Sequence, residues 1–331
     1  MNGPWKWVPV FALVVFLVLA CSLAYTKAPW CDEGWWVNPA YDLAFRGHMG
    51  MNVVEPTGQF IHADLRGLQE RTYTFPPNHF VALAGWFRVF GFSAFRARLY
   101  SICWSLITLA ALFYILRKLF PDPRVAHLAI LFVAMDFVFL WSTADGRPDA
   151  MASSLVTCSV ALYLRLREGD LRRAILVSQI FAAAGVFAHF NASVLVLALA
   201  AITWHLDRDR LKFQHLAHAG APYLLFASLW SFYILQKPND FIAQFFPQAG
   251  WSQRWNGIFR PDLAIVSEIR RHLAAYSVND VWTGIANGWA ILIPLLYLSV
   301  AVWFMRSSHR LGKSERAFLA FARCWCARRL S

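Results

Sequence analysis

The sequence lacks several features that would place it in common classes of protein. It contains no glycine-rich phosphate loop of the P-loop or dinucleotide-binding type, so we expect no nucleotide cofactor. It shows no internal repeat, and its six cysteines are scattered without a disulfide framework. The pair Cys324 and Cys326 is closely spaced, but one such pair does not predict a metal finger. Cys21, Cys103 and Cys158 lie in apolar segments and are interpreted as packing residues.

Charged residues are also scarce. They make up 15% of the chain, whereas hydrophobic residues make up 58%, and the mean hydropathy is +0.43. Ordinary soluble domains are about 45–50% apolar, and a helix needs about 20 apolar residues to cross a bilayer. Several windows reach that length, so we predict an all-α integral membrane protein.

The net charge of +12 raises the alternative of nucleic-acid binding. However, the basic residues form short clusters between apolar segments, a pattern typical of the cytoplasmic loops of membrane proteins. We therefore expect membrane lipids, and no nucleic acid, as partners. The clusters read LRKLFPDPR, RLREGDLRR, DRDRLK and RSSHRLGKSER.

These clusters predict a bundle of about eight transmembrane helices with a cytoplasmic N-terminus, in a domain that spans residues 1–305. The first helix is interpreted as a retained signal-anchor rather than a cleaved signal peptide. The run at 174–206 is long enough for one tilted helix, but a break at His189–Asn191 preserves the charge alternation and predicts two. The predicted spans are 7–26, 99–116, 125–142, 150–166, 174–188, 191–206, 216–235 and 285–305.

Two long segments are then external, at 27–97 and 237–284, and residues 306–331 form a basic cytoplasmic tail or a truncated end. The first external loop carries two helix signals. Asn38-Pro39 predicts the start of a short helix that ends at Gly47, and a second helix is predicted from His79 to Phe90, ended by Gly91. Both are too short to span, so we expect interfacial helices on the membrane surface.

Most of the notable polar residues fall at the external ends of the predicted spans. Asp32 and Glu33 follow the first span, Arg98 opens the second, Arg147 and Asp149 join the third and fourth, and His189 joins the fifth and sixth. Each could be an ordinary solvated loop residue. Polar groups that gather at one depth of a helical bundle indicate a site, so the set is predicted to form one.

Three segments in this order resemble a known family. They are DEGWWVNPAYDLAFRG, TYTFPPNHFVALAGWFRVFGFSAFRARLYS and RPDA, at residues 32–47, 72–101 and 147–150. The ordered set is similar to the C-type glycosyltransferase superfamily, in its protein O-mannosyltransferase and aminoarabinose-transferase branch, over residues 1 to about 205. That family usually has more than eight spans, so the chain is expected to be incomplete.

The resemblance implies a membrane glycosyltransferase. Its donor would be a sugar on a polyprenyl-phosphate carrier, and its acceptor a hydroxyl of a lipid, glycan or protein on the external face of the plasma (inner) membrane. Asp32 is the candidate general base, because a positioned carboxylate can take the proton of an acceptor hydroxyl. Glu33 would orient the acceptor, bind a divalent metal or simply be solvated, so the cofactor stays open.

The leaving group of such a transfer is an anionic lipid phosphate, which arginine binds through two parallel hydrogen bonds. Arg98 is the first candidate for this contact and Arg147 the second, although Arg98 could snorkel and Arg147 could pair with an acid. Asp149 could hold Arg147 or contact the sugar. His79 and His189 are further candidates for substrate binding.

Two other functions remain open from the sequence. A transporter would place charges near the bilayer midplane and show repeated halves, and Asp136 is the one clear mid-span charge. A non-catalytic membrane subunit of an envelope-assembly complex is the second. Loss of activity in a folded Asp32 variant would separate an enzyme from both.

Overall fold

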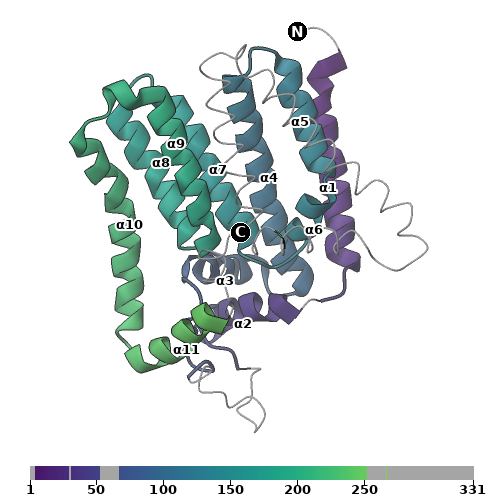
Figure 1. Ribbon diagram of the computed structural model, residues 1–331. Helices are drawn as coiled ribbons and strands as arrows, with labels where there is room; N and C mark the ends of the chain where they lie inside the picture. Colours follow the sequence, from purple (N-terminus) through teal and green to yellow (C-terminus); the bar gives the residue numbers. More distant parts are fainter. Residues whose placement is uncertain (1–3, 30, 53–66, 252–265, 267–331) are drawn as a thin grey trace. The chain divides into compact units, whose positions relative to one another are not determined.

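The computed structural model describes residues 4–29, 31–52, 67–251 and 266, and within them it contains helices and no strand (Figure 1). The chain divides into two compact units. The first comprises Met1–Val196 and Leu211–Gln248, and the second comprises Leu197–Arg210 and Ala249–Ser331. The all-helical prediction is confirmed for the described residues. The predicted span at 285–305, the tail at 306–331 and most of the loop at 237–284 lie outside them.

Each predicted apolar run within the described residues forms a helix or a broken pair of helices. The predicted break near His189 is confirmed, because α8 ends at Val186 and the short helix η3 (Phe190–Ala192) precedes α9 (Ser193–Asp207). The other helices of these runs are α1 (Val8–Thr26), α4 (Ala94–Leu119), α5 (Pro123–Met135), α6 (Phe137–Thr143), α7 (Asp149–Leu166), α8 (Leu171–Val186) and α10 (Phe213–Ile234).

Three helical stretches in the described residues are long and apolar enough to cross a membrane, namely Trp5–Thr26, Ala94–Leu119 and Phe190–Arg210. The pair α5 and α6 becomes a fourth if it is counted as one span, bent by 60°. These helices support the membrane assignment. The total of about eight spans stays a prediction.

The bend between α5 and α6 explains the one clear mid-span charge in the sequence, Asp136. Asp136 is the N-cap of α6, and its carboxylate accepts a hydrogen bond from the Phe139 backbone N–H at 2.7 Å. A carboxylate in this position satisfies one of the otherwise unpaired N–H groups at a helix start. Asp136 is therefore buried as a structural cap.

The two helices predicted in the first external loop are present, but one begins earlier than predicted. Helix α3 (Asn78–Phe90) ends at Gly91, whose φ of 77° suits glycine, as the sequence indicated. Helix α2 runs from Cys31 to Phe45 and contains Pro39 in its interior, so the start predicted at Asn38 is wrong. Side chains elsewhere in the fold anchor the first turn of α2, and this outweighs the cost of an internal proline.

Packing in the first unit brings the ends of distant segments together. Helix α7 packs against α4 and α8, α1 packs against α4 and α5, and α2 packs against α3. In Figure 1, α2 and α3 lie across the end of the bundle where α1 ends and α4 begins. At the other end of α4, Lys118 pairs with Glu168 at 3.1 Å, which joins two of the basic loops. The polar residues of interest lie at the end covered by α2 and α3.

Candidate functional site

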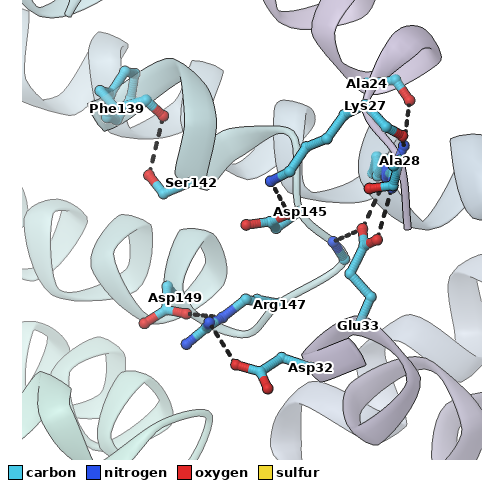
Figure 2. Close-up of polar contacts among 12 residues, drawn as sticks. Ala24, Lys27, Ala28, Asp32, Glu33, Phe139, Ser142, Asp145, Arg147 and Asp149 are labelled. Atoms are coloured by element: carbon cyan, nitrogen blue, oxygen red, sulfur yellow. Dashed lines mark hydrogen bonds and ion pairs between the residues drawn. The ribbon is translucent and has the colours of Figure 1, made fainter. Parts of the chain in front are cut away.

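The candidate site lies where four segments meet: the residues after α1, the first turn of α2, the start of α4 and the loop 144–148 between α6 and α7 (Figure 2). We call this region the mouth. The structure brings Asp32, Glu33, Arg98, Arg147 and Asp149 together there, although more than a hundred residues separate the first from the last. The roles assigned to them from the sequence stay predictions, and the geometry bears on each.

Arg98 is the most enclosed of these residues, with a side chain that is 3% exposed. Its Nε and Nη2 donate to the two carboxylate oxygens of Glu33 at 2.8 and 2.7 Å, a bidentate pair. Nη1 donates to the carbonyls of Ala24 and Lys27 at 2.8 and 2.7 Å, and Nη2 also reaches that of Ala28 at 3.4 Å. All five N–H donors of the guanidinium thus meet protein acceptors, and Arg98 ties the end of α1 to the first turn of α2.

Glu33 holds the loop between α6 and α7 as well as Arg98. Its Oε1 accepts a hydrogen bond from the Gly146 backbone N–H at 3.1 Å. A Cβ at Gly146 would lie 3.0 Å from Cγ2 of Val37 and 3.3 Å from Cβ of Ala97, so the loop is seated closely against α2 and α4. Glu33 therefore has the contacts of a residue that organises the mouth.

A second buried ion pair joins Lys27 to Asp145, and the sequence analysis did not identify it. Both side chains are almost fully buried, and the Lys27 ammonium also lies 3.9 Å from the ring centroid of Trp141. Burial raises the pKa of the Asp145 carboxyl, and the neighbouring Lys27 opposes this shift. One signal in the sequence indicated this pair. Lys27 lies at the predicted external end of a span, where the positive-inside rule disfavours a lysine, so an acidic partner could have been expected.

Arg147 lies between two carboxylates on the open side of the mouth. Its Nη1 donates to Oδ2 of Asp32 at 3.0 Å, and its Nε donates to Oδ2 of Asp149 at 3.0 Å. The side chain of Asp32 is 44% exposed, and those of Arg147 and Asp149 are each 31% exposed. Unlike Arg98, these three residues are within reach of a solute.

His79 and His189 lie beside this network in an aromatic cluster. Trp36 contacts both, with ring centroids 6.0 Å from His79 and 5.7 Å from His189. His79 is fully buried, and neither of its ring nitrogens has a hydrogen-bond partner among the described residues. Burial lowers the pKa of His79 to about 3, with a smaller opposing effect from Asp149. The imidazole is therefore neutral at physiological pH.

His189 has a local structural role, since its Nδ1 accepts a hydrogen bond from the Asn191 backbone N–H at 3.3 Å and caps η3. Among the described residues, no group of three or more His, Cys, Asp or Glu side chains is arranged to hold a metal ion. The carboxylates of the mouth are instead each engaged by an arginine or a lysine.

Comparison with known proteins gives one family match. Residues 75–233 match the family model of dolichyl-phosphate-mannose-protein mannosyltransferase, and no curated protein or solved structure matches the chain. The matched segment contains Arg98, Arg147 and Asp149 and begins after Asp32 and Glu33. The match confirms the resemblance to the C-type glycosyltransferases of the protein O-mannosyltransferase branch, and at the family level it supports a membrane glycosyltransferase that uses a polyprenyl-phosphate-linked sugar.

Proposed function

We propose that this protein transfers a sugar from a polyprenyl-phosphate carrier to a hydroxyl group of a lipid, glycan or protein on the external face of the plasma (inner) membrane. The observation that carries the proposal is the arrangement of Asp32, Arg147 and Asp149. Two carboxylates flank one arginine, and all three side chains are partly exposed at the end of the bundle where α1 ends. The family match supports the class of donor.

In the proposed reaction, the acceptor oxygen attacks the anomeric carbon of the sugar while the bond from that carbon to the phosphate oxygen breaks. Asp32 takes the proton of the acceptor hydroxyl, and the lipid phosphate leaves with the electrons of the broken bond. The transition state resembles an oxocarbenium ion, as in other glycosyl transfers. A positioned general base contributes about 10²–10⁴-fold to such a rate. The exposure of Asp32 supports this role, because the acceptor must reach its carboxylate.

Arg147 is the better candidate for the contact with the phosphate. Arg98, which the sequence favoured, directs its five donors to Glu33 and to three backbone carbonyls. A phosphate could bind there only after these buried contacts broke. We therefore propose that Arg147 binds the leaving phosphate and that Arg98 positions Glu33. Asp149 then orients Arg147 through its Nε.

The aromatic cluster of Trp36, His79 and His189, which we call the aromatic side of the mouth, is proposed to face the sugar. A neutral imidazole both donates and accepts a hydrogen bond, which suits hydroxyl groups. His79 has this form, and Trp36 offers an apolar face beside it. His189 is a further candidate at the edge of the same cluster.

The proposal places the mouth outside the cell and the N-terminus in the cytoplasm. Cysteine substitutions at Arg46, beyond α2, and at Glu168, between α7 and α8, test this in a background without native cysteines. An impermeant thiol reagent applied to intact cells should label Arg46→Cys and spare Glu168→Cys. The reverse pattern would move the mouth to the cytoplasmic side and contradict the proposal.

Asp32→Asn tests the chemistry. The change removes the charge with almost no change of shape, so transfer from polyprenyl-phosphate sugars should fall by about 10²–10⁴-fold while the protein stays in the membrane at normal levels. Asp209→Asn is the matched control, because the Asp209 side chain is 81% exposed and lies outside the mouth. If Asp32→Asn keeps most of its turnover, Asp32 is not the base. A wild-type protein that transfers no sugar from any such donor would favour a transporter or a non-catalytic subunit.

A further inference from the structure

The loop 144–148 carries Arg147 and is held at three successive residues. The Asp145 carboxylate pairs with the Lys27 ammonium, the Gly146 N–H donates to Glu33, and the Arg147 guanidinium lies between Asp32 and Asp149. Figure 2 shows Lys27 and Asp145 on one side of this loop and Asp32 on the other. The position of Arg147 is therefore coupled through the backbone to contacts that face away from the open side.

Lys27 joins the two buried ion pairs of the mouth. Its backbone carbonyl accepts a hydrogen bond from Nη1 of Arg98 at 2.7 Å, and its side chain reaches Asp145. The Trp141 ring covers the ammonium at 3.9 Å. The pair of Lys27 and Asp145 thus lies between α6 and the Arg98 contacts and has little freedom to rearrange.

A buried ion pair is a poor stabiliser, because the cost of removing two charges from water offsets most of their attraction. Its geometry, by contrast, fixes the groups that carry the charges. Here the fixed group is Asp145. It directly precedes Gly146, where an added Cβ would lie 3.0 Å from Val37, and it is two residues before Arg147, which is proposed to bind the phosphate. A small displacement of Asp145 must move Gly146 and Arg147 with it.

We propose that the Lys27–Asp145 ion pair is a positioning device that sets the place of Arg147 in the mouth. Lys27 and Asp145 do not touch the substrate. They hold the loop so that Arg147 meets the leaving phosphate, and Glu33 fixes the same loop from the other side. This inference rests on the proposed function, in which Arg147 binds the phosphate of the donor.

The test removes both charges together, because removal of one would leave the other buried and unpaired. In Lys27→Met/Asp145→Asn, kcat for sugar transfer should fall by about 10–100-fold, since small misplacements of a catalytic contact have effects of this size, while KM for the acceptor stays close to the wild-type value. The single variant Lys27→Arg keeps the positive charge opposite Asp145, so it should retain most of the wild-type kcat. Lys118→Met/Glu168→Gln is the matched control at the other end of α4 and should leave kcat unchanged.

A readout without turnover separates this inference from the proposed function. Phenylglyoxal modifies arginine side chains, and mass spectrometry of peptides gives the modification rate of each one. The rate for Arg147 should change several-fold in the double variant, whereas the rate for the exposed Arg46 should not. This result is expected whatever reaction the protein catalyses.

Gly146→Ala provides a second variant that keeps every charge. Its added Cβ displaces the same loop from Val37 and Ala97. Both kcat and the reactivity of Arg147 should therefore change in the direction expected for the double variant. If the double variant does not accumulate in the membrane, Asp145→Glu decides the matter, because it keeps both charges but lengthens one partner of the pair and should change kcat and the reactivity of Arg147. Wild-type kcat and wild-type Arg147 reactivity in the variants that fold would overturn the positioning role. Inactive wild-type protein with altered Arg147 reactivity in the variants would instead overturn the proposed function and leave the positioning role intact.

Discussion

The two sides of the mouth differ in whether their buried polar groups have partners. On one side, Lys27, Glu33, Arg98 and Asp145 are all nearly buried, and each faces a group of opposite charge. On the other side, the imidazole of His79 is fully buried among aromatic rings with no hydrogen-bond partner in the described part of the chain. Burial lowers the pKa of His79, so the imidazole of the second side is neutral.

This difference suits the two parts of the proposed donor. A lipid phosphate carries a negative charge and needs cationic donors, while a sugar presents uncharged hydroxyls and an apolar face. The charged side supports Arg147, and the aromatic side offers Trp36 and a neutral imidazole. The comparison predicts that variants on the charged side will affect stability through broken pairs, and that the aromatic side will respond to pH.

The largest expected effect comes from breaking the Arg98–Glu33 pair. Arg98→Met leaves Glu33 buried without its bidentate partner and removes the donors to three carbonyls. Loss of one partner of a buried pair costs about 3–5 kcal/mol, so the detergent-solubilised variant should unfold at a much lower temperature or denaturant concentration. Glu33→Gln should also destabilise, but by less, because the amide still accepts one hydrogen bond.

The double variant Arg98→Met/Glu33→Gln provides the control for this effect. It removes both charges, so its loss of stability should be smaller than the sum of the two single losses. Unfolding transitions of the four proteins, followed by circular dichroism in one detergent, give the coupling free energy. Additive losses would mean that the two side chains do not act as a pair, and the description of the charged side would be wrong.

The sequence predicts much of this arrangement, because the features concerned are local. Apolar runs predict α1, α4 and α7, and Gly91 predicts the end of α3, since hydrophobic length and helix stops are properties of short segments. The presence of Asp32 and Glu33 near Arg98 and Arg147 also follows from their shared place at the ends of spans.

The partners of these residues could not be predicted in the same way. Adjacent residues on a helix point about 100° apart, so Asp32 and Glu33 face different neighbours. Glu33 meets Arg98 and Asp32 meets Arg147 because of how α2 is rotated against α4 and α7, and packing sets that rotation. The early start of α2 has the same origin. The Asn38-Pro39 signal is local, but the first turn is anchored by contacts with residues 65 or more positions away.

The aromatic side should show the next largest effect, a dependence of stability on pH. The folded-state pKa of His79 is about 3, below the ordinary value of 6.5, so the unfolded state binds a proton first as the pH falls. The contribution to stability is complete above pH 6.5 and is lost progressively toward pH 3. Between pH 7.5 and pH 5 the loss amounts to about 2 kcal/mol.

His79→Phe should remove this dependence, because phenylalanine fills the same apolar surroundings and does not titrate. Asp149 and His189 are the titratable groups that influence His79, and both are kept in this variant. His48→Gln is the control, since His48 lies outside the cluster and is partly exposed. Melting temperatures in detergent at pH 7.5, 6 and 5 measure the effect. A wild-type protein that is equally stable at all three values would show that His79 is not held neutral by burial.

The smallest expected effect concerns an ion pair of the same chemical kind as Arg98–Glu33 that is exposed instead of buried. Lys118 and Glu168 form an ion pair at 3.1 Å, a distance similar to those in the mouth, but their side chains are 41% and 63% exposed. Water and salt screen such a pair, and its two side chains lose entropy when they are held together, so it contributes about 0–1 kcal/mol. Lys118→Met and Glu168→Gln should therefore each change stability by less than about 1 kcal/mol, and the measured change should shrink further as salt is added. Because the same kinds of substitution at Arg98 and Glu33 are expected to cost several times more, the two pairs can be measured side by side in one detergent and one buffer. A loss above about 2 kcal/mol for the exposed pair would mean that burial does not explain the cost of breaking the Arg98–Glu33 pair.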